Sequence, residues 1–149
     1  MGRSPGRLKR LPRRCLILAE GVLCLAVAWL AIHCLPYRLL VRGFRRPLRM
    51  PQLQGERRTF WVNEVRWGVD AAGRVLPWRM VCFPRAVAAW WMLRRRGVGT
   101  VLHYGAVTTP ERGLKTHVWL QDGELGVVGL SEAHGFAVLA RYPATEKED

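Results

Sequence analysis

The sequence contains few cysteines, and none of them belongs to a Cys-x-x-Cys pair. The cysteines are Cys15, Cys24, Cys34 and Cys82, and the first three lie in or beside one apolar run. Zinc sites and disulfide frameworks need clustered or regularly spaced cysteines, so neither is predicted here. This usage is typical of a protein in a reducing cytosol, and we expect no metal and no cofactor.

Acidic residues are also scarce. The 149 residues include 11 Asp and Glu against 24 Lys and Arg, which gives a formal net charge of +13 at pH 7. This excess suggests an acidic partner, a membrane surface or nucleic acid. An arginine-rich proteome would give the same charge without any partner. The aromatic-plus-basic motif of a nucleic-acid-binding module is missing, so we expect no nucleic-acid partner.

The N-terminal region divides into a basic tail and an apolar run. Residues 1–14 are basic and interrupted by proline and glycine, and we expect them to be disordered. The apolar residues 16–35 follow and are long enough to span a bilayer. A secretory signal fits least, because Trp29 directly follows the only candidate cleavage site.

The apolar run favours a packed or peripheral helix over a membrane span. Glu20 lies well inside the run, where an ionised carboxylate would be costly in lipid. Arginines flank the run on both sides, so charge asymmetry gives no orientation. Glu20, Cys24, Ala28 and Ala31 form a small, mildly polar stripe at helical spacing, as on a helix that packs against a domain. Both alternatives remain open at this point.

A basic connector with Pro47 and Pro51 completes the segment 15–55, and a helix is expected over residues 57–76. The next helix, over residues 82–97, is the best defined. Pro84 fits only a first helical turn, three arginines at 94–96 suit a last turn, and Gly97 predicts a left-handed C-cap. The residues between are apolar on every side, which predicts a buried helix with Cys82 at its start.

The C-terminal half predicts an antiparallel sheet. Strand-forming residues occupy 100–107 and 115–121, and the turn signal Asp122-Gly123 predicts a hairpin with a return strand over 124–129. A last strand is expected over 136–141. Helices followed by hairpin-linked strands indicate an α+β fold. We therefore expect one core over residues 56–142 and an acidic tail over 143–149.

A cysteine at a helix start and a histidine on the sheet beside it are typical of Cys–His acyl-transfer enzymes. The unpaired N–H groups and the dipole at a helix start favour the thiolate and can stabilise an oxyanion. Of the four histidines, His117 has the best context, because it lies mid-strand on the same face as Trp119. His103, also on a strand, is the competitor, whereas His33 falls in the apolar run and His134 in a turn. A purely structural role for His117 is the alternative.

Five further blocks of the sequence are distinctive, namely Leu76-Pro77-Trp78-Arg79, Cys82-Phe83-Pro84-Arg85-Ala86, Leu93-Arg94-Arg95-Arg96-Gly97, Leu102-His103-Tyr104-Gly105 and Thr116-His117-Val118-Trp119. Together they resemble the lasso-peptide leader peptidases. The similarity extends from about Leu16 to Tyr142 and includes the apolar N-terminal helix. These stand-alone, B-type processing proteins of lasso-peptide biosynthesis are cysteine proteases of transglutaminase-like, papain-related fold.

The resemblance implies a transglutaminase-like core in which a central nucleophile-bearing helix packs on an antiparallel sheet, preceded by a hydrophobic helix. It implies a cytoplasmic cysteine peptidase that removes the leader from a ribosomally made lasso precursor peptide. The implied partners are that precursor, a separate small leader-binding protein and an asparagine-synthetase-like ATP-dependent cyclase. The alternative is a catalytically weak scaffold in a maturation complex at the inner face of the membrane.

In this reading Cys82 and His117 are catalytic, and the backbone N–H groups of Cys82 and the helix start form the oxyanion site. Trp78 and Trp119 are expected to line the substrate cleft. Members of the family usually carry an Asp after the histidine to orient its ring, and this sequence departs from that pattern.

The predicted hairpin register explains why the orienting residue is in doubt. A two-residue turn places Val128 opposite His117 and a three-residue loop places Gly129 there, and neither side chain can accept a hydrogen bond. Glu132, in the following loop, is the candidate orienting acid. Ser131 or a backbone carbonyl are the alternatives.

Overall fold

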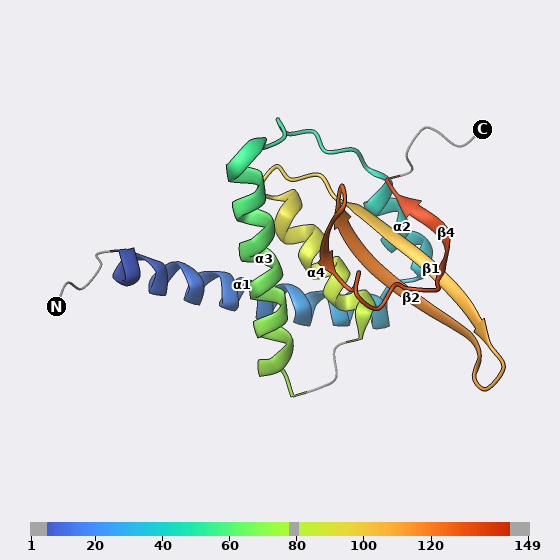
Figure 1. The fold of residues 1–149 in the computed structure, drawn as a ribbon. Coiled ribbons are helices and arrows are strands. Elements are labelled where there is room, and N and C mark those ends of the chain that lie inside the picture. Colours follow the sequence, from blue (N-terminus) through green and yellow to red (C-terminus); the bar gives the residue numbers. More distant parts are fainter. Residues whose placement is uncertain (1–5, 78–80, 144–149) are drawn as a thin grey trace.

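The computed structural model describes residues 6–77 and 81–143 (Figure 1). In this described part, helices precede strands, which confirms the α+β class. The helices are α1 (Gly6–Cys34), α2 (Tyr37–Arg45), α3 (Gly55–Val75) and α4 (Cys82–Arg94). The strands are β1 (Val101–Thr109), β2 (Gly113–Asp122), β3 (Leu125–Val128) and β4 (Ala137–Tyr142).

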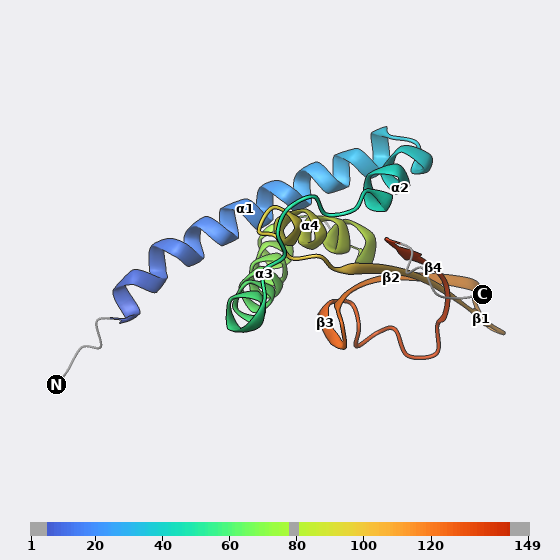
Figure 2. The same ribbon diagram turned by 90° about the horizontal axis from the view of Figure 1, so that it is seen from above.

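The elements form layers, which Figure 2 shows from above. α1 lies on the outside, α3 and α4 form the middle layer, and the sheet covers α4 on the other side. The segment between β3 and β4 crosses the face of the sheet that is turned away from α4. α4 is therefore enclosed between other elements, as its apolar sequence predicts.

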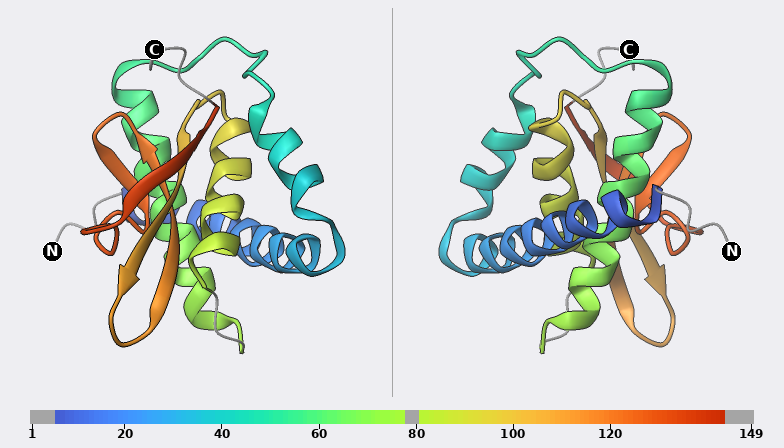
Figure 3. Two further views of the ribbon diagram at one scale, coloured as in Figure 1. Left: turned by 90° about the vertical axis from the view of Figure 1, so that its right-hand side faces the viewer. Right: turned by 90° about the vertical axis from the view of Figure 1, so that its left-hand side faces the viewer.

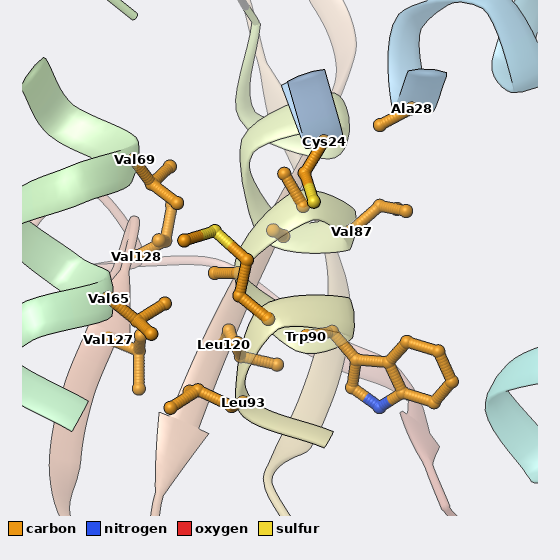
Figure 4. Close-up of a cluster of buried hydrophobic side chains, with 14 of the residues drawn as sticks. Cys24, Ala28, Val65, Val69, Val87, Trp90, Leu93, Leu120, Val127 and Val128 are labelled. Carbon is orange, nitrogen blue, oxygen red and sulfur yellow. The ribbon is translucent and has the colours of Figure 1, made fainter. Parts of the chain in front are cut away.

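The core is centred on α4. Ala86, Val87, Ala88, Ala89 and Met92 have no more than 1 % of their surface exposed. Figure 4 shows how α3 contributes valines to this cluster and how the strands contribute aliphatic side chains. After the helix, Gly97 has a φ of +74°, which confirms the left-handed conformation expected of it.

α1 packs on α3 through two glycines. A Cβ atom on Gly21 would lie 2.9 Å from the Gly68 carbonyl oxygen, and one on Gly68 would lie 2.5 Å from a methyl group of Ile17. The helices can approach this closely only because neither residue has a side chain. Figure 3 shows α1 crossing α3 on the outside of the middle layer.

Glu20 fastens α1 to the end of α4. Its carboxylate accepts hydrogen bonds from Arg96 at 2.5 and 2.8 Å and pairs with Arg95 as well. Burial alone would raise the pKa of Glu20, but the hydrogen bonds and charges of Arg96 and Arg95 outweigh it and lower the pKa below its ordinary value. The carboxylate inside the apolar run is thus explained by contact with the folded domain.

The strands form one antiparallel sheet in the order β3-β2-β1-β4. Asp122 pairs with Leu125, so the turn residues are Gly123 and Glu124 rather than Asp122 and Gly123. An irregularity between Leu120 and Gln121 shifts the pairing further. The register expected from the sequence is therefore wrong. The Asp122 carboxylate instead accepts hydrogen bonds from Arg58 of α3, at 2.9 and 3.0 Å from Nε, which fastens the hairpin to the helices.

The structure differs from the sequence prediction at both ends of the N-terminal region. Residues 6–14, for which disorder is expected, belong to α1, where Arg13 pairs with Glu64 and Arg14 lies over the Trp67 ring. Part of the expected connector is α2, because Leu40, Val41 and Phe44 fall on one helical face and are buried. The acidic tail lies beyond the described residues, apart from Pro143.

Replacing Glu20 tests how α1 is held. We expect Glu20→Gln to lower the free energy of unfolding at pH 7 by about 1–3 kcal/mol, because charge-assisted hydrogen bonds to two arginines are lost. Since the folded-state pKa is depressed, this contribution is present above the ordinary Glu value of about 4.3 and disappears as the pH falls through the lower folded-state pKa. Urea unfolding at pH 7 and pH 3 measures both effects. The control is Glu124→Gln at the exposed hairpin turn, and an equal loss in both variants at pH 7 would contradict the account.

Candidate functional site

Cys82 is the first residue of α4, as the sequence predicts. No side chain caps the helix start, so backbone N–H groups of the first turn have no intrahelical or capping partner. Pro84, in the same turn, has no N–H to contribute. The thiol is half-buried and packs against the core at the end of the helix. A nucleophile here would have oxyanion donors beside it.

The other three cysteines occupy different surroundings. Cys24 is buried between helices, and burial raises the pKa of its thiol, which keeps it protonated and unreactive. Cys15 and Cys34 are exposed on α1, outside the core. All four are free thiols, so Cys82 alone combines a free thiol with a helix start.

His117 lies on β2 and is held by a backbone carbonyl. Its Nε2 atom is 2.7 Å from the carbonyl oxygen of Gly129. Because a carbonyl can only accept, Nε2 must carry the hydrogen, which leaves Nδ1 as the proton acceptor of the neutral ring. Trp119 and Phe136 flank the imidazole, with ring centroids at 5.8 and 5.3 Å. The ring therefore has one tautomer and one orientation.

The structure does not bring Cys82 and His117 together. Val118 and Leu120 point into the core beneath α4, so His117 and Trp119, which alternate with them, lie on the opposite face of the sheet. Among the described residues no hydrogen bond joins the Cys82 thiol to the His117 ring. The expectation that both side chains face one another is thus not met. Alternation along a strand predicts which residues share a face of the sheet. Which of the two faces lies against α4 depends on how the helix packs.

The edge of β2 is open beside His117. β3 pairs with β2 only as far as Leu120, so its hydrogen bonds end before His117 is reached. Beyond that point the chain leaves β3 at Gly129, and residues 129–136 fold under the sheet (Figure 2). Gly129 has a φ of +75°, and a Cβ atom there would lie 3.2 Å from His117 Nε2. The backbone path that holds the histidine therefore needs glycine.

A cavity of about 440 Å³ lies between α3, the first turn of α4 and the outer edge of β3. Arg85, one helical turn after Cys82, forms part of its wall and pairs with Asp70 of α3. Gly129, which holds His117, forms another part. The lining also includes Arg66, Ser131, Glu132, His134 and residues 126–130. The cavity thus adjoins the supports of both candidate catalytic residues.

Glu132 does not take the orienting role expected of it. It is exposed and accepts a hydrogen bond from Ser131 Oγ at 3.0 Å, while the partner of His117 is the Gly129 carbonyl. The backbone carbonyl, one of the alternatives to Glu132, is therefore the observed orienting group. The reason is the irregular register, which brings the backbone of Gly129 next to the ring before the chain reaches Glu132.

The tryptophans and remaining histidines are placed as follows. Trp119 is only 4 % exposed, stacks on His103 and His117, and is not part of the cavity lining expected for it. Burial and the charge of Arg141 lower the pKa of His103, which therefore stays neutral beneath Trp119. His33 lies on α1, far along the chain from this site, and its Nδ1–H donates to the Trp29 carbonyl oxygen at 2.7 Å. Trp78 lies outside the described residues.

Arg66, Asp70, Arg85 and Gly129 are functional candidates that sequence reasoning missed. Arg85 could have been found, because a residue three positions after Cys82 returns to the same side of the helix. Asp70 and Arg66 belong to another helix, and no sequence pattern connects them with Cys82. Among the described residues no group of three or more His, Cys, Asp or Glu side chains is arranged to hold a metal ion.

Comparison with known proteins gives one match. A family model described as the transglutaminase-like superfamily matches residues 21–141. No curated protein and no solved structure matches the chain. The matched range begins within α1 and ends within β4, so it includes both Cys82 and His117.

Replacing Gly129 tests the support of His117. We expect Gly129→Ala to destabilise the fold by about 1–2 kcal/mol through left-handed backbone strain and to displace the imidazole from the carbonyl. Gly113→Ala is the matched control, because Gly113 has a φ of +68° but open space around its Cβ position. Ring ¹⁵N chemical shifts report the tautomer. Loss of the Nε2–H pattern is expected in Gly129→Ala alone, and an unchanged His117 spectrum in that variant would refute the assignment.

Proposed function

Because the chain belongs to the transglutaminase-like superfamily, which includes cysteine peptidases, we propose that it is a cysteine peptidase that removes the leader from a ribosomally made lasso precursor peptide. The observation that carries the proposal is the position of Cys82. It is a free, half-buried thiol at the uncapped start of the central helix. The resemblance of the Cys82 and His117 blocks to the lasso-peptide leader peptidases supplies the substrate class.

In the proposed reaction His117 takes the proton of the Cys82 thiol, and the resulting thiolate attacks the carbonyl carbon of the scissile peptide bond. Negative charge develops on the carbonyl oxygen, and N–H groups of the first turn of α4 stabilise it. His117 gives its proton to the leaving amine as the C–N bond breaks, which leaves a thioester on Cys82. Water then attacks the thioester with His117 as general base, releasing the leader acid and the free thiol.

This chemistry requires His117 to approach Cys82 when substrate binds. The open edge of β2 beside His117 has unpaired backbone groups, which an extended peptide can pair with as an added strand. A peptide along this edge would compete for the position of Gly129 and release the imidazole from its carbonyl. Because the imidazole lies on the face of the sheet turned away from α4, β2 must also turn locally to present it to Cys82. Catalytic hydrogen bonds often form only in the substrate complex, and substrate-driven assembly of the pair makes cleavage specific for the correct precursor.

The cavity beside the first turn of α4 is the proposed binding site for residues next to the scissile bond. Its charged lining from Arg66, Arg85 and Asp70 suits polar rather than apolar side chains. The proposed partners are the precursor, a separate leader-binding protein and an asparagine-synthetase-like cyclase that closes the new N-terminus. We place the reaction in the cytoplasm, where the precursor is made.

One observation favours a second candidate function. The thiol and the imidazole lie on opposite faces of the sheet, and a backbone carbonyl takes the place of the acid that usually orients the histidine. A catalytically weak scaffold that holds the maturation enzymes together would have this arrangement. Substitution of the two candidate residues separates the alternatives.

We expect Cys82→Ala and His117→Ala each to lower the rate of precursor cleavage at least about a thousandfold, because each removes one half of the acyl-transfer pair. The control is Cys34→Ala, which removes an exposed thiol on α1 and should leave the rate unchanged. Cleavage is followed by mass spectrometry with the leader-binding protein present. Full maturation by both variants would establish the scaffold instead.

Glu132→Gln should retain kcat within about threefold of the wild-type value, because Glu132 contacts Ser131 and not the His117 ring; as part of the cavity lining it can change KM. Loss of an orienting acid in a catalytic triad lowers kcat far more than this, by about four orders of magnitude in one serine protease. Steady-state kinetics of the purified variant makes the measurement. A loss of a hundredfold or more would restore Glu132 as the orienting residue.

A further inference from the structure

The outer face of α1 is an exposed apolar stripe. Leu16, Leu23 and Leu30 repeat at seven-residue intervals and keep 70 %, 64 % and 55 % of their surface exposed. Val27 and Trp29 are also exposed beside them. At 1.5 Å per residue the stripe is about 21 Å long. Figure 3 shows α1 lying across the outside of the middle layer, where no other helix or strand of the described residues covers this face. Isolated exposed leucines are ordinary, but an aligned series on one helix marks a contact surface.

Charged residues lie at the borders of the stripe and not within it. Between Arg14 and Arg38 the only charged residue is Glu20, and Arg95 and Arg96 neutralise its carboxylate on the inner side of the helix. Arg38 and, in the next turn of α2, Arg42 are exposed beyond its C-terminal end, and Arg95 is exposed beside Glu20 at its border. An apolar face bordered by guanidinium groups is complementary to a lipid surface, whose acyl chains lie beneath anionic headgroups.

α1 is long and apolar enough over Pro12–Cys34 to cross a bilayer. Its inner face, however, is already used. Ile17 and Leu25 are buried against the middle layer, Gly21 touches α3, and Glu20 is paired with the end of α4. A membrane span would have to break these contacts and carry the carboxylate into lipid. The packed helix can instead lie in the plane of the membrane surface.

We propose that the exposed face of α1 binds the surface of an anionic lipid bilayer, with Leu16, Leu23 and Leu30 inserted and the flanking arginines at the headgroups. A second copy of the chain fits the face less well, because two chains of net charge +13 repel one another at the ends of the stripe. Binding in this orientation leaves the sheet and the cavity at its edge away from the lipid, since α1 and the sheet lie on opposite sides of the middle layer (Figure 2).

Vesicle flotation tests the proposal with the full chain. Vesicles of phosphatidylglycerol and phosphatidylcholine should carry the wild-type protein upward, and vesicles of phosphatidylcholine alone should carry much less. Leu23→Glu should lower partitioning onto the anionic vesicles about tenfold or more, because a leucine that inserts into the lipid is replaced by a charge. Binding should also weaken as salt rises.

Leu114→Glu is the matched control, because Leu114 is 71 % exposed in the β1–β2 hairpin, away from α1. It should float like the wild type, and thermal unfolding should confirm that both variants are folded. Failure of the wild type to float, or equal loss in the two variants, would overturn the proposal. A dimer that Leu23→Glu dissociates, without any vesicle binding by the wild type, would overturn it in favour of a second copy.

Discussion

Burial of α4 on every side is the constraint on which the rest of the structure depends. A helix that is apolar all round must be enclosed, so the sheet covers one side while α1 and α3 cover the other. The two ends of α4 lie outside this enclosure. At one end the arginines hold Glu20 of α1, and at the other the half-buried thiol of Cys82 adjoins the unfilled N–H groups of the first turn. Packing thus produces the position of the candidate nucleophile.

Much of the fold could be predicted from local signals. Pro84 and Gly97 mark the ends of α4, and the Asp122-Gly123 signal correctly joins two antiparallel strands. The start of α1 and the existence of α2 could not be predicted in the same way. Arg14 is ordered by stacking on Trp67 of α3, a contact between distant parts of the sequence. The composition of a local segment does not indicate such contacts.

The candidate site could be predicted from the sequence less completely than the fold. Cys82 is identified by helix signals alone, but the face of His117 depends on how the sheet docks on α4. The orienting group depends on an irregularity beside Leu120, which brings the Gly129 carbonyl to the ring. Backbone acceptors have no sequence signature, so a search for an acidic third residue led to Glu132. Family membership supports the peptidase chemistry, while the observed separation of thiol and imidazole makes substrate-driven assembly a necessary part of the account.

The most direct test of Cys82 as nucleophile is to trap the covalent intermediate. The wild-type chain is mixed with a lasso precursor peptide that it cleaves and with a leader-binding protein, quenched in acid during turnover, digested and analysed by mass spectrometry. The account predicts a leader fragment joined by a thioester to the peptide that contains Cys82. Steady cleavage with no adduct on that peptide, or an adduct on Cys15 or Cys34, would contradict it.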